Sequence, residues 1–158
     1  MTVAITIVGM NRISASLGLA LAGQKHQLKL TGIDRDPKKV QQALKLGALD
    51  ETAANLEKAV QEADVVILCV PLDELQENLE IILPALKAEA VLLDTSSVQV
   101  QVLEWVKAQL PAGRYFLTFY PTLNPDFLTE ASTDLADARA ELFKGGLCVI
   151  SNPPRTNE

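Results

Sequence analysis

The chain has 158 residues, 48% of them apolar and 22% charged, which suits one globular domain with its own hydrophobic core. A net charge of −6 and a pI near 4.8 argue against nucleic-acid binding, whose usual footprint is a basic patch. The sequence has no apolar run of the ~18 residues expected of a membrane span and no signal-peptide pattern, so we expect a cytoplasmic protein that does not enter a membrane.

Short apolar runs alternate with helical patterns along the chain. The runs predict strands over residues 4–9, 29–34, 65–70, 90–95, 115–120 and 147–151. Several have no polar side, as is typical of parallel strands covered on both faces. Because strands that alternate with helices form right-handed βαβ units, we predict an α/β fold with a doubly wound, mostly parallel sheet of the Rossmann type.

Capping residues and prolines place the helices. The predicted helices begin at Asp36-Pro37 and at Asn55, run from Asp73 to Pro84, and cover residues 98–110. The long loop 122–146 is expected to carry one short helix over 134–143. After the last strand, two prolines and a new helix-start pattern predict one domain over residues 1–151 and, over residues 152–158, a linker that opens a further domain.

The cysteines and the histidine give no sign of a disulfide or a metal site. Cys69 and Cys148 each lie in an apolar run, so both are expected to be buried free thiols. The only histidine, His26, lies in a polar turn and is expected at the surface. One histidine makes a histidine-based metal site implausible, and we predict no bound metal.

The first strand leads into a segment placed like a dinucleotide-binding loop, but its G-x-G-x-x-G motif reads GMNRIS over residues 9–14. Gly9 keeps the tight turn. Asn11, which tolerates a left-handed backbone, replaces the glycine that lets a pyrophosphate approach, and Ser14 replaces the packing glycine. Together with Ile13, these residues would open the helix whose N-terminus binds the pyrophosphate, and the Arg12 guanidinium is expected to pair with it.

The second strand ends in an acid where such folds hold the cofactor's ribose. Asp34 lies 25 residues after Gly9 and is suited to accept a hydrogen bond from the 2′-hydroxyl of NAD. Arg35, with Lys38 and Lys39 one turn later, is suited instead to the 2′-phosphate of NADP. The cofactor is therefore predicted to be NAD or NADP.

Other strand ends should meet at the same edge of the sheet, where ligands bind in doubly wound folds. The candidates there are Val70, Pro71, Leu72 and Thr95 toward the cofactor, and Ser97 and Tyr120 toward a small-molecule substrate. Plain structural roles fit several of them equally well. Pro71 can simply end a strand, Thr95 can belong to a helix cap, and Tyr120 can pack on the sheet.

The ordered motifs resemble the N-terminal half of the prephenate and arogenate dehydrogenases. The similarity extends from "TIVGMNRISASLGLAL" through "LGALDE" and "ADVVILCVP" to "LFKGGLCVISNP". It implies an NAD(P)-binding domain followed by a helical domain that forms a homodimer and completes the substrate site. It also implies hydride transfer from C4 of the substrate ring to the nicotinamide, with oxidative decarboxylation of prephenate, in tyrosine biosynthesis.

The resemblance also marks where this chain departs from the family. Ser97 matches a serine of the family's D-x-G-S-V-K segment that positions substrate, while Gln99 replaces its lysine. Tyr120 stands where the family has the histidine of an H-P-M pattern. A phenol titrates near pH ~10 and an imidazole near neutrality. Losing a positioned base costs about 10²–10⁴ in rate, so Ser97 and Tyr120 are candidate catalytic residues of a weakened or altered site.

Two other interpretations stay open. One is a catalytically impaired nucleotide-binding homologue with a regulatory or dimerising role, since the two glycines, the lysine and the histidine are all replaced. The other is a different enzyme of the wider 6-phosphogluconate-dehydrogenase-like superfamily, acting on another small substrate.

Overall fold

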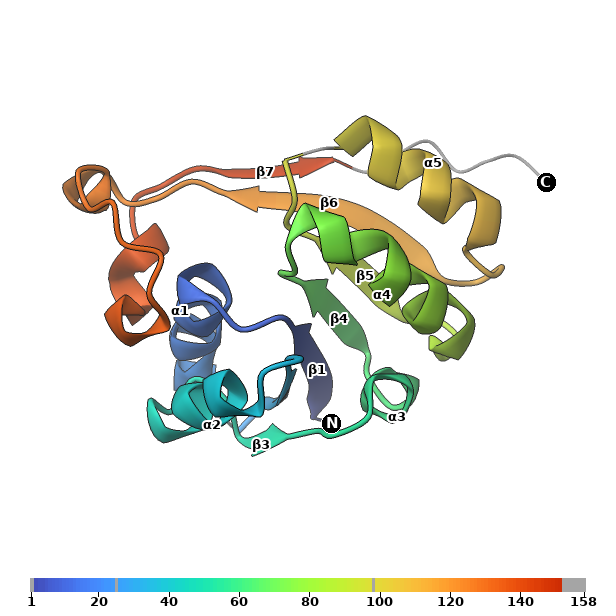
Figure 1. Cartoon of the computed structure of the whole chain (residues 1–158), viewed down its shortest axis with the longest axis horizontal. Helices are drawn as coiled ribbons and strands as arrows, with labels where there is room; N and C mark the ends of the chain where they lie inside the picture. Colours follow the sequence, from blue (N-terminus) through green and yellow to red (C-terminus); the bar gives the residue numbers. More distant parts are fainter. Residues whose placement is uncertain (1, 25, 98, 152–158) are drawn as a thin grey trace.

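One seven-stranded sheet runs through the computed structural model, which describes residues 2–24, 26–97 and 99–151 (Figure 1). The strands are β1 (Val3–Val8), β2 (Leu28–Ile33), β3 (Glu51–Thr52), β4 (Val65–Leu68), β5 (Val91–Asp94), β6 (Tyr115–Pro121) and β7 (Cys148–Ser151). Their order is β3-β2-β1-β4-β5-β6-β7. All neighbours pair in parallel except β7, which is antiparallel to β6. The predicted α/β fold with a mostly parallel sheet is confirmed.

Helices cover both faces of this sheet (Figure 1). The α-helices are α1 (Arg12–Leu21), α2 (Pro37–Lys45), α3 (Leu56–Gln61), α4 (Leu72–Ala85) and α5 (Gln99–Gln109), joined by the 3₁₀ turns η1 (Ala22–Gln24), η2 (Pro125–Phe127), η3 (Leu135–Asp137) and η4 (Ala140–Phe143). The chain winds from β1 outward to β3, then returns to β4 and winds the other way. The direction of winding therefore reverses between β1 and β4.

Two apolar clusters form the core, one on each face of the sheet. Ile5 and Ile7 of β1 pack with α1 and α2, whereas Val8 packs with α3, α4 and α5 on the opposite face. On the Val8 face, the buried Thr6 hydroxyl donates a hydrogen bond of 2.7 Å to the Ala59 carbonyl of α3. Because both faces are covered, β1 needs apolar residues on both sides, as its sequence indicates.

The observed elements depart from the sequence prediction chiefly at β3 and at the end of α4. The two-residue strand β3 was not predicted, since it is polar and forms only by pairing with Thr31 and Gly32 of β2. Helix α4 continues to Ala85 and takes Pro84 into its last turn. The Leu86 amide still donates to the Ile82 carbonyl there, so this proline does not end the helix where expected. Val98, expected to begin the next helix, lies outside the described residues.

Segment 122–146 does not form the expected helix over residues 134–143. It forms the separate turns η3 and η4, with Ala138 and Arg139 extended between them. Asp134 caps only the first turn, through its bond to the Ala136 amide. The Arg139 amide donates instead to the Ser16 hydroxyl of α1, at 3.0 Å, and this long-range bond draws the chain out of a helical path.

The two cysteines and the histidine agree with the predictions except at Cys148. Cys69 is buried and free, and His26 is exposed, as predicted. Cys148 is free but exposed, because β7 is an edge strand with one neighbour.

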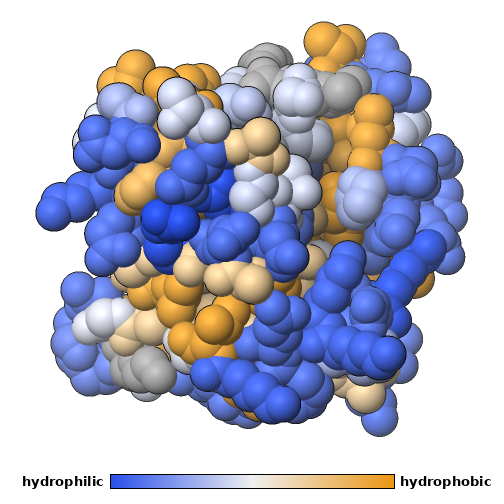
Figure 2. All heavy atoms as spheres, turned by 60° about the vertical axis from the view of Figure 1, so that its left-hand side comes forward, coloured by the Kyte–Doolittle hydropathy of each residue, from blue (hydrophilic) through white to orange (hydrophobic). Residues whose placement is uncertain are grey.

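The face in Figure 2 is covered mostly by hydrophilic residues, with apolar residues gathered in patches between them. No described helix has the length and apolar character to cross a bilayer. The predicted linker 152–158 lies outside the described residues.

Candidate dinucleotide-binding site

A cleft of about 670 Å³ opens at the carboxyl ends of β1, β2 and β4. This is the point where the winding reverses, the place where doubly wound sheets bind ligands. The predicted cofactor residues that line it are Gly9, Asn11, Asp34, Arg35, Val70 and Pro71. Lys39 of α2 lines it as well, and the wall formed by α4 adds Glu74 and Glu77, which sequence reasoning did not single out.

Gly9 fills the role expected of the first glycine in the motif. Its φ is +89°, a left-handed backbone that side chains disfavour. A β-carbon on Gly9 would lie 2.7 Å from the Cys69 carbonyl oxygen, so β1 and the end of β4 leave no space for one. The Gly9 amide donates to the Ile33 carbonyl at 2.8 Å, which ties the turn to β2. The floor of the cleft therefore depends on this glycine.

Asn11 and Ser14, the two replacements in the motif, act as a pair. Asn11 is the N-cap of α1: its side-chain oxygen accepts from the Ser14 amide at 3.0 Å, and the Ser14 hydroxyl accepts from the Asn11 amide at 2.9 Å. The Asn11 side-chain amide also donates to the Cys69 carbonyl at 2.9 Å. Asn11 has an extended backbone (φ −144°), so its tolerance of a left-handed backbone is not used, and its role is that of a capping box.

Asp34 is the half-buried acid at the end of β2. The Met10 amide donates to one of its carboxylate oxygens at 2.6 Å, and the Asp36 amide donates to the other at 2.8 Å. These bonds fix the carboxylate at the wall of the cleft. A carboxylate accepts up to about four hydrogen bonds, so Asp34 keeps capacity for a sugar hydroxyl.

Arg35 extends from the end of β2 across to α4. Its Nη2 pairs with Glu77, and its Nε lies 3.6 Å from a Glu74 carboxylate oxygen. The hydrogen bond to Glu77, reinforced by the charge of Glu74, raises the pKa of the Arg35 guanidinium. Arg35 therefore stays cationic, with its charge already directed at two carboxylates.

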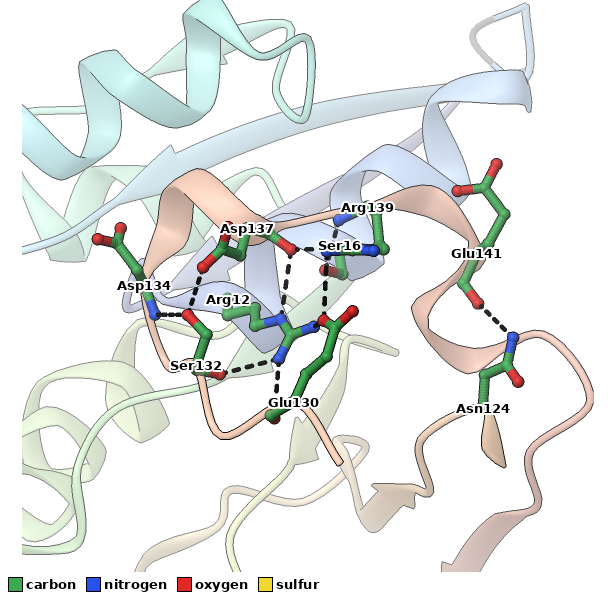
Figure 3. A network of polar contacts seen from close by, with 9 residues as sticks. All are labelled: Arg12, Ser16, Asn124, Glu130, Ser132, Asp134, Asp137, Arg139 and Glu141. Carbon is green, nitrogen blue, oxygen red and sulfur yellow. Dashed lines mark hydrogen bonds and ion pairs between the residues drawn. The ribbon is translucent and has the colours of Figure 1, made fainter. Parts of the chain in front are cut away.

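Arg12 does not line the cleft, and its partners place it elsewhere. Its side chain is only 4% exposed and contacts segment 122–146 (Figure 3). It forms an ion pair of 2.5 Å with Glu130 and donates to the carbonyls of Ser132 and Asp137, at 2.9 and 3.3 Å. Arg139 joins the same Glu130 carboxylate at 3.2 Å. The expected pairing of Arg12 with a pyrophosphate does not fit this arrangement.

The other predicted residues do not line the cleft. They are Ile13 and Ser14 in the first turn of α1, Leu72 at the start of α4, Thr95 and Ser97 after β5, and Tyr120 on β6. The Thr95 hydroxyl donates to the Leu68 carbonyl at 2.7 Å and links β5 to β4. Ser97 and Tyr120 are both exposed, beyond the cofactor cleft at the ends of neighbouring strands.

Two buried groups near this edge of the sheet have raised pKa values: Asp94 at the end of β5, and Cys69, which follows β4 and lines the cleft. Burial raises the pKa of the Asp94 carboxyl, while hydrogen bonds from the hydroxyl and amide of Ser96 partly oppose this. Burial also raises the pKa of the Cys69 thiol to about 12, so it stays protonated near neutrality. A buried, protonated thiol of this kind is a poor nucleophile.

The family of the chain follows from comparison with known proteins. The family model described as "Prephenate dehydrogenase, nucleotide-binding domain" matches residues 17–157. The chain belongs to this family. The matched region begins inside α1, so the unusual loop at residues 9–14 precedes it.

The chain shares only 24–30% sequence identity with two individual curated relatives. The chain is 24% identical over 155 residues to prephenate dehydrogenase of Bacillus subtilis, covering 98% of this chain and 40% of that protein. It is 30% identical over 107 residues to cyclohexadienyl dehydrogenase of Zymomonas mobilis, covering 68% of this chain and 36% of that protein. The chain therefore spans at most about 40% of these curated relatives.

Solved structures in the same family agree with the fold. Prephenate dehydrogenase from A. aeolicus, in complex with hydroxyphenyl propionate and NAD+, superposes with a TM-score of 0.82 at 20% identity, over 99% of this chain and 53% of that one. Synechocystis arogenate dehydrogenase gives 0.81 at 24% identity, over 98% and 51%. At this identity, the likeness establishes the Rossmann-type fold.

Proposed function

We propose that this domain binds NAD(P) in the cleft and serves an oxidoreductase of the prephenate dehydrogenase type, which oxidises prephenate or arogenate in tyrosine biosynthesis. The observation that carries the proposal is the Asp34 carboxylate, held by two backbone amides at the cleft wall beside the glycine turn. Membership of the family supports the reaction class. The A. aeolicus relative was crystallised with NAD+, which supports the cofactor.

The cleft residues suit the cofactor in a defined order along the sheet edge. Asp34 accepts a hydrogen bond from the adenosine ribose. Gly9 and Asn11 border the diphosphate, beside the positive end of α1 formed by Ile13 and Ser14. Toward the nicotinamide, the wall is formed by Val70 and Pro71, with Leu72 and Thr95 next to them.

We assign the substrate to the same edge of the sheet, next to Ser97 after β5 and Tyr120 on β6. Bound NAD(P) supplies a hydride acceptor there. In our proposal the Ser97 hydroxyl helps orient the substrate, and the Tyr120 hydroxyl donates a hydrogen bond to its ring oxygen. Tyr120 is 45% exposed and is thus accessible to a substrate. Because a phenol is a weak base at neutral pH, we expect turnover about 10²–10⁴ lower than with a positioned base.

Calorimetric titration with NAD, NADH, NADP and NADPH tests the proposal. We expect one or more of these dinucleotides to bind, and Asp34→Asn to weaken the tightest of them about tenfold, the loss expected for one charge-assisted hydrogen bond. Asp126→Asn removes an exposed carboxylate from η2, outside the cleft, and serves as the control. Absence of binding at millimolar ligand would refute the proposed function.

The packing of α1 favours one second candidate, a nucleotide-binding homologue with little or no turnover and a regulatory or dimerising role. The first turn of α1 is capped by Asn11, and Arg12 is bound by segment 122–146, so neither side chain is free to contact a diphosphate. NADH binding without oxidation of prephenate or arogenate by the longest natural chain would favour this candidate. Measurable oxidation of either substrate would exclude it.

The proposal has two further parts that follow from the family resemblance. The whole protein forms a homodimer through a helical domain that follows residue 151, and it acts in the cytoplasm. Light scattering of the longest natural chain and cell fractionation test these parts separately from dinucleotide binding.

A further inference from the structure

The charged residues of the cleft are distributed over two facing walls. Asp34 and Arg35 extend from the end of β2, and Glu74 and Glu77 extend from α4. Arg35 spans the opening and contacts both glutamates. The arginine that sequence reasoning offered to a 2′-phosphate is therefore already bound to the opposite wall.

The position of the two glutamates is set by the packing of α4. Leu75 and Leu79 are fully buried on the core face of this helix, which fixes its rotation. Glu74 and Glu77, three residues apart, therefore lie together on the cleft side. The buried Asn78 side chain donates to the Glu74 carbonyl at 2.8 Å and reinforces the first turns. The carboxylates thus belong to a rigid wall, although Arg35 itself is 58% exposed.

The cleft presents three carboxylates, Asp34, Glu74 and Glu77, against the two cations Arg35 and Lys39. A phosphate monoester carries a charge of about −1.5 to −2 near neutral pH. It would have to displace Glu74 and Glu77 from Arg35 while facing Asp34. A free 2′-hydroxyl meets no such competition, because it donates to Asp34 and leaves the Arg35 contacts in place.

We propose that Glu74 and Glu77 are specificity-determining residues that hold Arg35 across the cleft and make it select NAD over NADP. This inference rests on the proposed dinucleotide site and extends it from NAD(P) to one cofactor. It assigns the discrimination between NAD and NADP to α4, on the wall of the cleft opposite Asp34. Exposed ion pairs are individually weak, so the discrimination comes from repelling a phosphate more than from the strength of the pairs.

The test compares NADH and NADPH affinities by calorimetry at low ionic strength. We expect the unmodified chain to bind NADH at least about tenfold more tightly than NADPH, since like charges placed together disfavour the wrong ligand. The double variant Glu74→Gln/Glu77→Gln frees Arg35. It should strengthen NADPH binding about tenfold and leave NADH binding within about twofold.

A charge-matched control separates this effect from net charge. Glu80→Gln/Glu104→Gln removes two exposed carboxylates outside the cleft and should leave the NADH-to-NADPH ratio unchanged. Adding Arg35→Ala to the α4 double variant should reverse only the smaller part of the gain in NADPH affinity, the part that comes from the freed guanidinium. All these positions are exposed or partly exposed, and thermal unfolding monitored by circular dichroism verifies that each variant is folded.

The outcomes distinguish this inference from the proposed function. Tighter NADPH than NADH binding by the unmodified chain would overturn the inference and leave the proposed function standing. An unchanged ratio in the α4 double variant would do the same. Binding of neither dinucleotide to any variant would overturn both.

Discussion

The first turn of α1 and the end of β2 both border the cleft, but they use their polar groups in opposite ways. In α1, Asn11 and Ser14 bond to each other and Arg12 is bound by segment 122–146. At the end of β2, Asp34 keeps hydrogen-bonding capacity and Arg35 lies across the opening. The start of α1, where two motif glycines are replaced, thus satisfies its polar groups through bonds within the protein. The charged groups available for recognising a ligand lie at β2 and α4.

The glycine turn between these two regions should tolerate change least. Gly9→Ala should lower the free energy of unfolding by about 3 kcal/mol and abolish NADH binding, because φ is positive and a β-carbon would meet the Cys69 carbonyl. Gly23→Ala adds a β-carbon to open space and should change stability by less than about 0.5 kcal/mol. Urea unfolding measures both variants, and equal effects would refute the steric account.

Replacing Arg12 tests whether the first turn of α1 is structural or ligand-binding. Arg12→Met should lower the free energy of unfolding by about 2–3 kcal/mol, since it leaves Glu130 and two carbonyls without their buried partner. Hydrogen exchange should become faster in residues 130–139. NADH affinity should change less than about threefold, because Arg12 is outside the cleft. A large loss of affinity in a folded Arg12→Met variant would instead support a role in binding pyrophosphate.

Asn11 tests how much the capped first turn obstructs a ligand. Asn11→Gly should cost only about 0.5 kcal/mol of stability and tighten NADH binding about fivefold, since it clears a side chain from the approach to α1. Asn11→Ala should cost about 1 kcal/mol, because the cap bond is lost without the freedom of glycine. Calorimetry and thermal unfolding measure both. Unchanged or weaker affinity in Asn11→Gly would count against obstruction.

The smallest expected effect concerns Asp94, the buried residue that ends β5. The folded state raises the pKa of this carboxyl, so its charged form is disfavoured by burial. Asp94→Asn should therefore raise the free energy of unfolding at pH 7 slightly. Wild type should regain that difference as the pH falls through the raised pKa, and fully below the ordinary aspartate pKa of ~3.9. Urea unfolding from pH 7 to pH 3 measures the difference, which should not depend on pH if Asp94 titrates normally.

The sequence was sufficient for features that depend on local pattern. The apolar runs identified every strand except β3, whose polar residues pair only because β2 lies beside them. Asp36 and Asn55 cap helices as predicted, because a cap is a contact within one turn. The helix expected over 134–143 failed because the Arg139 amide bonds to Ser16, a partner distant in the sequence.

The site was predictable to the extent that it follows from the ends of strands. Gly9, Asp34 and Pro71 line the cleft because parallel strands end at one edge. The partners of Arg12 and Arg35 were not predictable in the same way, because Glu130 and Glu77 approach them only after folding. A pair of glutamates one helical turn apart, just after "CVPL", was the available signal for the α4 wall.

The two thiols differ so much in exposure that their rates of alkylation can report how often the cleft floor opens. Cys148 is exposed and should be alkylated at once, whereas Cys69 is buried beneath the Asn11 amide with a pKa of about 12. Its alkylation must wait for β4 and the glycine turn to part. The lag between the first and second label, read by mass spectrometry, therefore times how often the cleft floor opens, and any molecule that stabilises the floor should lengthen it.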